Sequence, residues 1–487
     1  MNLIKTDKAF LWPTHRPGPQ WWGWQDYIEH QIGEPLWTIH RLDKETTGCQ
    51  VFAKDKASAA EAEKEFRKNL VEKQYVFISK FKASSFHCED PIGGKDAQTD
   101  FELISEADGL YLYKALPKSG RKHQIRIHAK ACGMPLLGDK DYGIKDEWPH
   151  FFLHCHKMKI AGREYESPLP YYFQNLKLFS QAKVVQALQH IHARRFLFSP
   201  DTNAYCLLHK EVGDLRIEIL GEQIIYEIYE ERAWHAELIR SLHQEIENLF
   251  DQQFPYIIQY MNNRGQDPHK LAIEYFAGAK QVWKIQEHGA LYEMRAEQGK
   301  SYGLFLDQRK RRWSFAKKAK GKDVLNLFCY TGGFSVLAAK MGAKAITNVD
   351  TSQNTLDWLK QNLELNDIPT EKWEYWSSDA RIFIRGAIKK QRKYDLIVCD
   401  PPSFARSKNK SFQIKKEWRQ LIQDCQRLLK PGGSLYFSMN YEALTWKSFR
   451  QQVEEIAPGA EFQRSSWDFE APTKNTNLKA FTWSAPL

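Results

Sequence analysis

The C-terminal part of the chain alternates short apolar runs with amphipathic segments, and this alternation restricts the fold more than any other feature of the sequence. After about residue 301, helical segments separate buried strands that are expected at 324–328, 345–349, 396–399 and 434–438. Apolar strands that alternate with helices form parallel sheets whose two faces are both covered. Residues 301–487 are therefore expected to fold as a Rossmann-like α/β domain with a doubly wound sheet.

The preceding residues follow other patterns and predict two more domains, because a chain of 487 residues is too long for one core. Residues 1–178 mix β-rich runs with one helix at 56–70, which favours an α+β domain with a mixed, mostly antiparallel sheet. Residues 179–300 combine short strands with a helix at 233–250, and we interpret them as a small α/β linking domain.

Charge and cysteine content narrow the class of protein. Lys and Arg outnumber Asp and Glu by 70 to 60, and the net charge of +10 suits a polyanionic partner such as RNA. The eight cysteines are scattered without a C-x-x-C pair or a zinc-like cluster, so we expect reduced thiols and no metal. We find neither a signal-peptide pattern nor a run of roughly 20 apolar residues, and therefore expect a cytoplasmic protein without a membrane partner.

Two segments in the N-terminal domain carry chemistry. The run HRLDKETTG at 40–48 places Asp43 between basic residues, where it should stay ionised and could act as a nucleophile or base. Alternatively, Asp43 only caps a turn or pairs with Arg41. The run GRKHQIRIH at 120–128 predicts a strand with Gln124, Arg126 and His128 along one face.

With PLLGD at 135–139, these motifs resemble the RluA-type pseudouridine synthases, and the match runs from about residue 8 to 172. The resemblance implies that Asp43 attacks or deprotonates the ribose of a flipped-out uridine, without cofactor or metal. It further implies that Arg126 pairs with this aspartate and that Tyr75 stacks on the base. The RNA is expected to contact Arg41, His123 and Gln124. The opening Lys-Pro-x-Gly strand of the family is matched only loosely, by HRPG at 15–18, and Thr47 and Lys122 replace the usual Ser and Thr.

The C-terminal domain contains a strand, a glycine turn and a helix in the run DVLNLFCYTGGFS at 323–335. Glycines allow close approach of a nucleoside, and Asp350 at the end of the next strand can accept hydrogen bonds from ribose hydroxyls. Ser378 and Asp379 follow a third strand, where they could meet an adenine amino group. The pattern favours S-adenosylmethionine (SAM), with expected contacts from Asp307, Arg309, Asn326, Phe328, Tyr330, Gly332, Gly333, Asp350, Asp379 and Asp400.

The run CDPPSF at 399–404 forms a rigid loop at the carboxyl end of a predicted strand, where such folds bind ligands. Together with GLFLDQR at 303–309, it resembles the class I SAM-dependent methyltransferases of bacterial 23S ribosomal RNA, over about 200–487. A branch that methylates carbon 5 of cytosine needs a cysteine nucleophile, but FSMNY at 437–441 has none. Only Cys399, directly before the acid, could replace it.

The sequence is closer to the guanine-N7 branch, which shares the motifs around 303–309 and 323–333 and the DPP loop through Ser407 and Lys408. Ring nitrogen N7 is already nucleophilic and needs only positioning. This resemblance implies that Asp400 is catalytic and that the base is held by Pro401, Pro402, Phe404 and Asn440, with Phe404 as the stacking residue.

Both resemblances together predict a bifunctional RNA-modifying enzyme that acts on 23S ribosomal RNA or a ribosome assembly intermediate, with the linking domain as a candidate RNA-binding element. Two alternatives stay open. The methyltransferase could make 5-methylcytosine or an N-methylated base, or one domain could be an inactive RNA-binding module. The basic runs at 310–312, 317–318 and 389–390 are equally consistent with solvated surface and with phosphate contacts.

Overall fold

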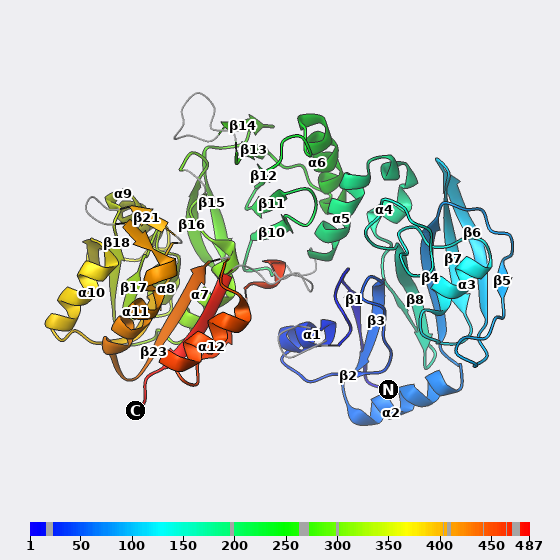
Figure 1. The fold of residues 1–487 in the computed structure, drawn as a ribbon, viewed down its shortest axis with the longest axis horizontal. Coiled ribbons are helices and arrows are strands. Elements are labelled where there is room, and N and C mark those ends of the chain that lie inside the picture. Colours follow the sequence, from blue (N-terminus) through cyan, green and yellow to red (C-terminus); the bar gives the residue numbers. More distant parts are fainter. Residues whose placement is uncertain are drawn as a thin grey trace. The chain divides into compact units, whose positions relative to one another are not determined.

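The computed structural model describes residues 1–15, 23–194, 199–262, 272–298, 301–402, 404–406, 411–441, 443–463, 465–469 and 478–487. The chain divides into two compact units, which Figure 1 shows as ribbons. Unit 1 comprises Met1–Phe196, Lys210–Gly213 and Arg232–Gln253, and unit 2 comprises Leu197–His209, Asp214–Glu231 and Phe254–Leu487. No helix in these described ranges is both long and apolar enough to cross a bilayer.

The described part of unit 1 is built on one mixed sheet of nine strands. Its order is β1-β3-β8-β4-β7-β6-β5, with β2 paired to β3 and β9 to β8, and every pairing except the parallel β3–β8 is antiparallel. This confirms the predicted α+β domain with a mostly antiparallel sheet. The strands are β1 (Leu3–Lys8), β2 (Trp37–Thr38), β3 (Thr47–Ala53), β4 (Glu72–Ser79), β5 (His87–Cys88), β6 (Thr99–Ala107), β7 (Leu110–Pro117), β8 (Leu153–Ile160) and β9 (Arg163–Glu166).

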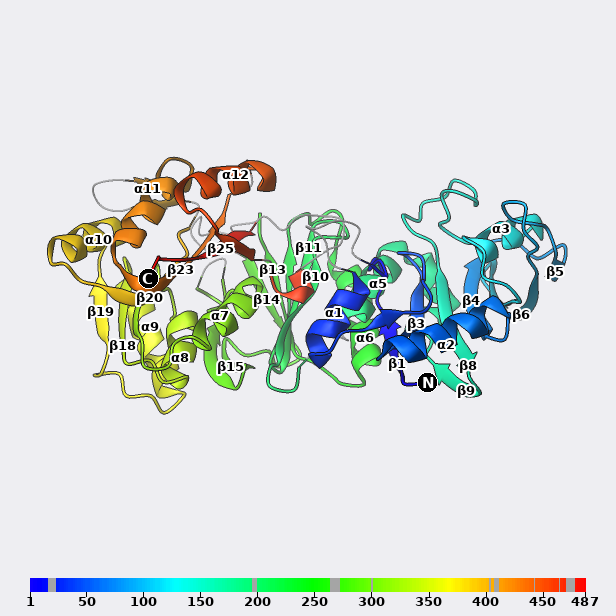
Figure 2. The same cartoon turned by 90° about the horizontal axis from the view of Figure 1, so that it is seen from below.

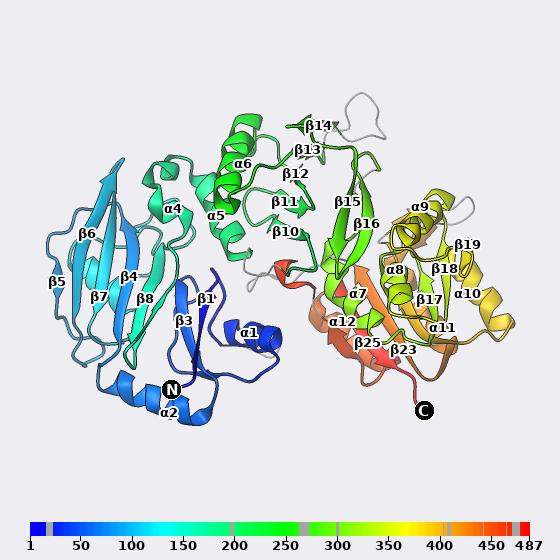
Figure 3. The ribbon, with the colours of Figure 1, turned by 180° about the vertical axis from the view of Figure 1, so that it is seen from behind.

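Six α-helices and one 3-10 helix belong to the described part of unit 1, and α2 and α3 pack against its sheet. The predicted helix is present as α2 (Lys56–Arg67), where the Asp55 side chain caps the first turn by accepting a hydrogen bond from the Ser58 amide. The others are α1 (Trp24–Ile32), α3 (Gln124–Ala131), α4 (Tyr171–Gln174), the 3-10 helix η1 (Leu176–Ser180), α5 (Ala182–Arg194) and α6 (Ala236–Phe250). Figure 3 shows α5 beside α6, which pack against each other.

Helix α3 corrects one expectation, because the strand predicted at 120–128 is wrong. Gln124 and His128 lie one helical turn apart, and both side chains hydrogen-bond to Thr99 on β6. His123, in the left-handed region at φ 57°, precedes the first turn. A polar residue at every second position over so short a run also satisfies the i, i+4 spacing of a helix, so periodicity alone could not separate the two.

The segment predicted as a linking domain contributes elements to both units. Its helices α5 and α6 belong to unit 1, whereas its sheet belongs to unit 2. This sheet has the order β10-β11-β12-β13-β14, and a separate hairpin joins β15 and β16. The bounds are β10 (Ala204–His209), β11 (Leu215–Leu220), β12 (Gln223–Ile228), β13 (Tyr256–Tyr260), β14 (Ala272–Phe276), β15 (Val282–Glu287) and β16 (Ala290–Arg295).

The C-terminal sheet of unit 2 has the order β19-β18-β17-β20-β23-β25-β24, in which only β25 runs antiparallel to its neighbours. Its strands are β17 (Asp323–Leu327), β18 (Ala345–Asp350), β19 (Glu374–Ser377), β20 (Tyr394–Cys399), β23 (Leu429–Asn440), β24 (Glu461–Gln463) and β25 (Leu478–Ser484). A small hairpin of β21 (Phe404–Arg406) and β22 (Ser411–Gln413) follows β20.

Helices cover both faces of this sheet (Figure 2), which confirms the predicted doubly wound fold. Neighbouring strand residues enter opposite cores, since Val324 packs in one hydrophobic cluster and Leu325 in the other. One face carries α7 (Arg309–Ala316), α8 (Gly333–Lys340) and α9 (Gln353–Glu364), and the other carries α10 (Ala380–Lys389), α11 (Ile414–Arg427) and α12 (Trp446–Ile456). Two 3-10 helices, η3 (Leu306–Gln308) and η4 (Trp467–Phe469), complete the unit.

Two of the three residues in the basic run at 310–312 are not solvated surface. Arg311 and Arg312 on α7 are 3% and 2% exposed and are bound within the protein. In contrast, the lysine pairs at 317–318 and 389–390 are exposed. A buried arginine must find local acceptors, so these two side chains contribute to the interior rather than to phosphate binding.

Candidate active sites

Unit 1 contains a cavity of about 570 Å³ between the loop around Asp43, strand β4 and the start of α3. Asp43, Arg126, Tyr75, Arg41, His123 and Gln124 all line it, so the structure brings the residues predicted for the first site together. The Asp43 carboxylate lies 3.9 Å from Nη1 of Arg126 and 3.8 Å from Nε2 of His123. One anionic side chain at the cavity wall therefore faces two basic ones.

Arg126 is held rigidly with one edge toward Asp43. Its Nε and Nη2 donate to the two carboxylate oxygens of Asp139 at 2.7 and 2.6 Å, and Nη2 also reaches Asp141 at 2.8 Å. The guanidinium further lies against the rings of Tyr142 and Phe151, at 4.9 and 4.4 Å from their centroids. Asp139 belongs to the PLLGD run that supported the resemblance, yet sequence reasoning assigned it no role.

Tyr75 and Gln124 form the wall in different ways. Burial raises the pKa of Tyr75 well above its usual range, so its hydroxyl is neutral. The Gln124 amide oxygen accepts from Ser119 and the Arg121 amide, and its nitrogen donates to the Gln98 carbonyl and to Thr99. These bonds fix the orientation of the Gln124 amide in the cavity wall, and its expected contact with RNA stays a prediction.

Lys8 was missed by sequence reasoning, although it supports the Asp43 loop. Its ammonium donates to the carbonyls of Ala9, Lys44 and Thr46 at 3.3, 3.0 and 2.7 Å. Burial lowers the pKa of Lys8 to about 7, while the nearby Asp43 opposes that change. The sequence of this strand, LIKTDK, is largely polar and gave no signal that Lys8 is buried. The segment we compared with the family's opening motif, HRPG, lies outside the described residues except for His15.

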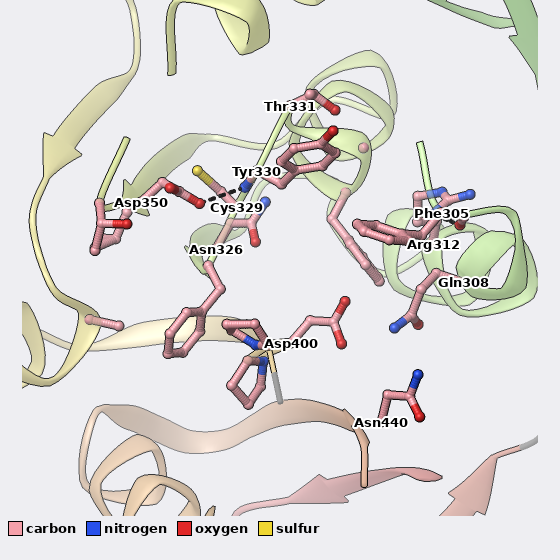
Figure 4. Close-up of a pocket in the computed structure, with 18 of the residues that line it drawn as sticks. Phe305, Gln308, Arg312, Asn326, Cys329, Tyr330, Thr331, Asp350, Asp400 and Asn440 are labelled. Carbon is pink, nitrogen blue, oxygen red and sulfur yellow. Dashed lines mark hydrogen bonds between the residues drawn. The ribbon is translucent and has the colours of Figure 1, made fainter. Parts of the chain in front are cut away.

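Unit 2 contains a second cavity, of about 420 Å³, at the carboxyl ends of β17, β18, β20 and β23. Figure 4 shows Asp350 at one end and Asp400, Gln308 and Asn440 gathered at the other. Cavities of a few hundred Å³ are typical of small-molecule sites, and this edge of a parallel sheet is where such folds bind ligands. The volume and the two separated carboxylates fit a nucleoside cofactor beside a second reactant.

The end marked by Asp350 has the features of a nucleoside site. One Asp350 oxygen accepts a hydrogen bond from the Tyr330 amide at 3.0 Å, and the other from the Ser352 amide at 3.0 Å. Phe328 and Tyr330 both have positive φ, at 57° and 48°, so the chain turns sharply directly after β17. Asn326 and Phe328 also line the cavity, as predicted.

The two glycines of the turn act mainly through packing. Gly332 does not line the cavity; a Cβ there would lie 2.3 Å from Leu359 Cγ on α9, and φ is 81°. Gly333 does line the cavity, and its Cβ would approach Leu304 to 2.7 Å. The expected reason for Gly332, close approach of the ligand, is therefore replaced by close approach of a helix.

Asp379 caps α10 at the cavity wall. Its carboxylate accepts from the Arg381 amide at 2.8 Å and pairs with the Arg381 guanidinium at 2.6 Å, which lowers the pKa of Asp379. Glu417 holds the same guanidinium from the other side, at 2.7 Å. Asp379 is thus an ionised, fixed acceptor.

Asp400 marks the other end, beside Pro401, Pro402 and Asn440. Burial raises the pKa of Asp400 to about 6, although Ser438 opposes the shift by donating a hydrogen bond of 2.6 Å to the carboxylate. The side chain of Phe404 lies outside the described part of the chain, as do Ser403, Ser407 and Lys408, so the stacking role of Phe404 stays a prediction.

Arg309 does not line the cavity, contrary to expectation. Its guanidinium binds Asp468 at 3.1 Å, lies 3.4 Å from Glu287 and covers the Tyr205 ring at 4.5 Å. Arg312 lines the cavity instead, held by two bonds of 2.8 Å to the buried Glu287. Sequence reasoning could not find this pair because Glu287 comes from the β15–β16 hairpin, far from the recognised motifs.

The cysteines offer no ready nucleophile, because all eight are buried and carry no disulfide. Cys329 lines the cavity, but burial raises the pKa of its thiol well above the usual range. Cys399 packs beside Cys425, away from the cavity, and burial raises its pKa likewise. Only a thiolate attacks readily, so covalent catalysis at cytosine carbon 6 is disfavoured.

Comparison with known proteins relates the segments that contain the two cavities to two enzyme families. Residues 25–131 match the RNA pseudouridylate synthase family, and residues 258–478 match the S-adenosylmethionine-dependent methyltransferase family. Among curated proteins, the chain is 42% identical over 158 residues to ribosomal RNA large subunit methyltransferase K of Neisseria meningitidis, covering 32% of this chain and 45% of that protein. It is 37% identical over 208 residues to ribosomal RNA large subunit methyltransferase K/L of Shewanella sp. (strain MR-4), covering 40% and 28%. The chain thus spans less than half the length of these relatives.

Two solved structures resemble more than half of the chain. A protein of Streptococcus mutans assigned as a SAM-dependent methyltransferase is 25% identical with a TM-score of 0.54, covering 63% of this chain and 81% of that one. A methyltransferase structure in complex with S-adenosylhomocysteine is 26% identical with a TM-score of 0.53, covering 69% and 89%. The chain therefore joins a domain of the RNA pseudouridylate synthase family to a domain of the S-adenosylmethionine-dependent methyltransferase family.

Proposed function

We propose that the chain is a bifunctional RNA-modifying enzyme, which converts uridine to pseudouridine in unit 1 and methylates guanine N7 of 23S ribosomal RNA in unit 2. The observation that carries this proposal is the pair of cavities, each of which gathers most of its predicted site residues, around Asp43 in unit 1 and around Asp350, Asp379 and Asp400 in unit 2. The domain families and the ribosomal RNA relatives support the same reading.

In unit 1, Asp43 acts on the ribose of the target uridine while Arg126, 3.9 Å away, orients the carboxylate. The bond from ribose C1′ to uracil N1 breaks, and a new bond forms from C1′ to C5. The proton on C5 leaves and N1 gains a proton, so the isomerisation consumes no cofactor. Tyr75, whose hydroxyl is neutral, supports the flipped base.

In unit 2, SAM supplies a methyl group on a sulfonium centre when bound. Asp350 lies where ribose hydroxyls can donate to it, and Asp379 lies on the same wall for the adenine. Asp400 and Asn440 then hold the guanine so that N7 meets the methyl carbon. No proton has to be removed from N7, and the negative Asp400 favours the positive charge that develops on the methylated ring.

The cavity favours guanine over cytosine because the thiol in its wall is neutral. The thiol of Cys329 is held neutral, whereas attack on cytosine carbon 6 needs a thiolate. A carboxylate such as Asp400 can accept hydrogen bonds from N–H donors of guanine and equally from the amino group of cytosine, so the preference for guanine rests on the neutral thiol. Formation of 5-methylcytosine, or of another N-methylated base, is the alternative for this domain.

The test uses ribosomal RNA from a strain that lacks the gene, treated with the full chain and SAM carrying a labelled methyl group. We expect labelled 7-methylguanosine and new pseudouridine, both mapped to 23S RNA. Asp43→Asn should abolish the pseudouridine alone, and Asp400→Asn should abolish the methyl mark alone. Label in 5-methylcytidine would refute the proposed base, and pseudouridine made by the Asp43→Asn protein would refute the proposed nucleophile.

A further inference from the structure

Behind Asp400 runs a row of buried hydrogen bonds that the proposed function does not use. Ser438 Oγ on β23 donates to Asp400 Oδ1 at 2.6 Å, and Gln308 Nε2 on η3 donates to Ser438 Oγ at 3.0 Å. Arg311 Nε on α7 donates to Gln308 Oε1 at 2.5 Å. Arg311, Gln308 and Ser438 are 3%, 2% and 2% exposed, so water does not compete for these bonds.

The direction of this row is fixed by its first member. Arginine has donors and no acceptor, so Gln308 has to present its carbonyl oxygen to Arg311. The amide nitrogen of Gln308 then faces Ser438 and occupies a lone pair of the hydroxyl oxygen. The hydroxyl hydrogen of Ser438 consequently goes to Asp400, which can only accept it. The row ends on a carboxylate in its ionised form.

We propose that Gln308 is a positioning residue for methyl transfer: through Ser438, it keeps Asp400 ionised and turns the second carboxylate oxygen toward the substrate base. Figure 4 shows Gln308 and Asp400 side by side at one end of the cavity. Within the described residues, Ser438 is the one hydrogen-bond partner of the Asp400 carboxylate. The inference rests on the proposed function only in giving Asp400 a part in the transfer.

The other charged groups that face Asp400 have opposite effects on its pKa. Asp307 on η3 disfavours a second negative charge, whereas Arg311 and Arg312 on α7 favour it. With a pKa of about 6, Asp400 is ionised at neutral pH by a narrow margin. Losing one hydrogen bond to the charged form shifts a pKa by about one to two units, which is enough to remove that margin.

The experiment measures the rate at which the full chain transfers labelled methyl groups from SAM to RNA, between pH 5 and 9. In Ser438→Ala, we expect the acid limb of the profile to move up by about one to two pH units. The rate at pH 7 then falls about two- to tenfold and recovers toward that of the wild type at pH 9. Ser438→Thr keeps a hydroxyl and should restore the profile. Gln308→Glu can accept from Arg311 but cannot donate to Ser438, and its added charge should move the limb further.

Ser434→Ala is the matched control, because Ser434 lies on the same strand and its hydroxyl meets Ser484 at 3.1 Å, remote from Asp400. Its acid limb should coincide with that of the wild type. If Ser438→Ala and Gln308→Glu lower the rate equally at every pH, the row only supports the fold and the proposal is wrong.

A second measurement needs no RNA. The titration of Asp400 can be followed by its carboxyl ¹³C signal, identified as the signal that Asp400→Asn removes. If this titration moves up in Ser438→Ala while the labelled product is not 7-methylguanosine, the proposed base is wrong and the positioning role stands. If the titration does not move, the positioning role is wrong whatever the base.

Discussion

Single buried charges set the chemistry of both cavities. In unit 1 a buried cation, Arg126, is fixed by Asp139 and faces Asp43. In unit 2 a half-buried anion, Asp400, is fixed by Ser438. Each group is costly to bury alone and keeps its charge because a neighbour is locked in place. Substitution of these neighbours should therefore lower the activity nearly as much as substitution of the groups that they hold.

Asp139→Asn tests this for Arg126. The change removes a carboxylate that is 1% exposed and that binds the guanidinium through both oxygens, so Arg126 loses its orientation toward Asp43. We expect pseudouridine formation to fall about 100-fold, while methyl transfer by the same protein is unchanged. Asp141→Asn is the matched control, because Asp141 is 67% exposed and its pairing is worth little. A loss as large in Asp141→Asn would contradict the assignment.

The pH dependence of the two activities should differ. A carboxyl group loses its charge as the pH falls through its pKa, and that of Asp400 is about 6. Methyl transfer should therefore be near its plateau at pH 7.5 and fall about tenfold for each unit below pH 6. Both rates are measured on one RNA preparation, and the isomerisation rate is the reference. If the methyl-transfer rate stays constant down to about pH 5, the reaction does not require an ionised Asp400.

At the scale of elements, helices and strands place the site residues through their ends. Asp350 and Asp400 stand at or directly after the carboxyl ends of β18 and β20, and Asp379 caps α10. The turn between β17 and α8 fits between these ends only because Gly332 adopts φ 81° against Leu359 of α9.

Gly332→Ala should destabilise unit 2. The new Cβ would overlap Leu359 and hold an alanine in the left-handed region, which together cost about 2–4 kcal/mol. Gly321→Ala is the matched control, since Gly321 also has positive φ, at 70°, but nothing lies within 4 Å of its Cβ position. It should cost only about 1 kcal/mol. Thermal unfolding of the two variants compares them, and equal losses would rule out the contact with Leu359 as the cause.

The sequence predicted well those features that are local. The alternation after residue 301 predicted the doubly wound sheet, and the family resemblance predicted one site for Asp43, Arg126 and Tyr75, which all line one cavity. The sequence-based prediction failed where contacts between distant segments determine the position of a side chain. Arg309 and Arg312 belong to one helix, and only the buried Glu287 of a distant hairpin determines which of them lines the cavity.

At the scale of the whole molecule, the two cavities described above belong to different units, and each unit has its own hydrophobic core. A ligand that binds only the folded form of one unit stabilises that unit and leaves the other unaffected.

Calorimetry of the full chain should therefore show the units separately. S-adenosylhomocysteine at about 100 times its Kd should stabilise unit 2 by about 2.7 kcal/mol and raise its transition by about 5–10 °C. The transition of unit 1 should stay where it is. In Asp350→Asn the shift should disappear, because Asp350 is the proposed ribose acceptor. A shift that persists in this variant would place the cofactor elsewhere.

The two units are interleaved along the chain, which passes between them after residues 196, 209, 213, 231 and 253. During synthesis, unit 1 cannot be completed until residue 253 has left the ribosome, because α6 is part of it. By that time, parts of unit 2 have emerged, although the rest of unit 2, from Phe254 onward, has not yet been synthesised. The same interleaving means that no single cut yields two intact halves: a gene divided after residue 196 would leave the first product without its last helix.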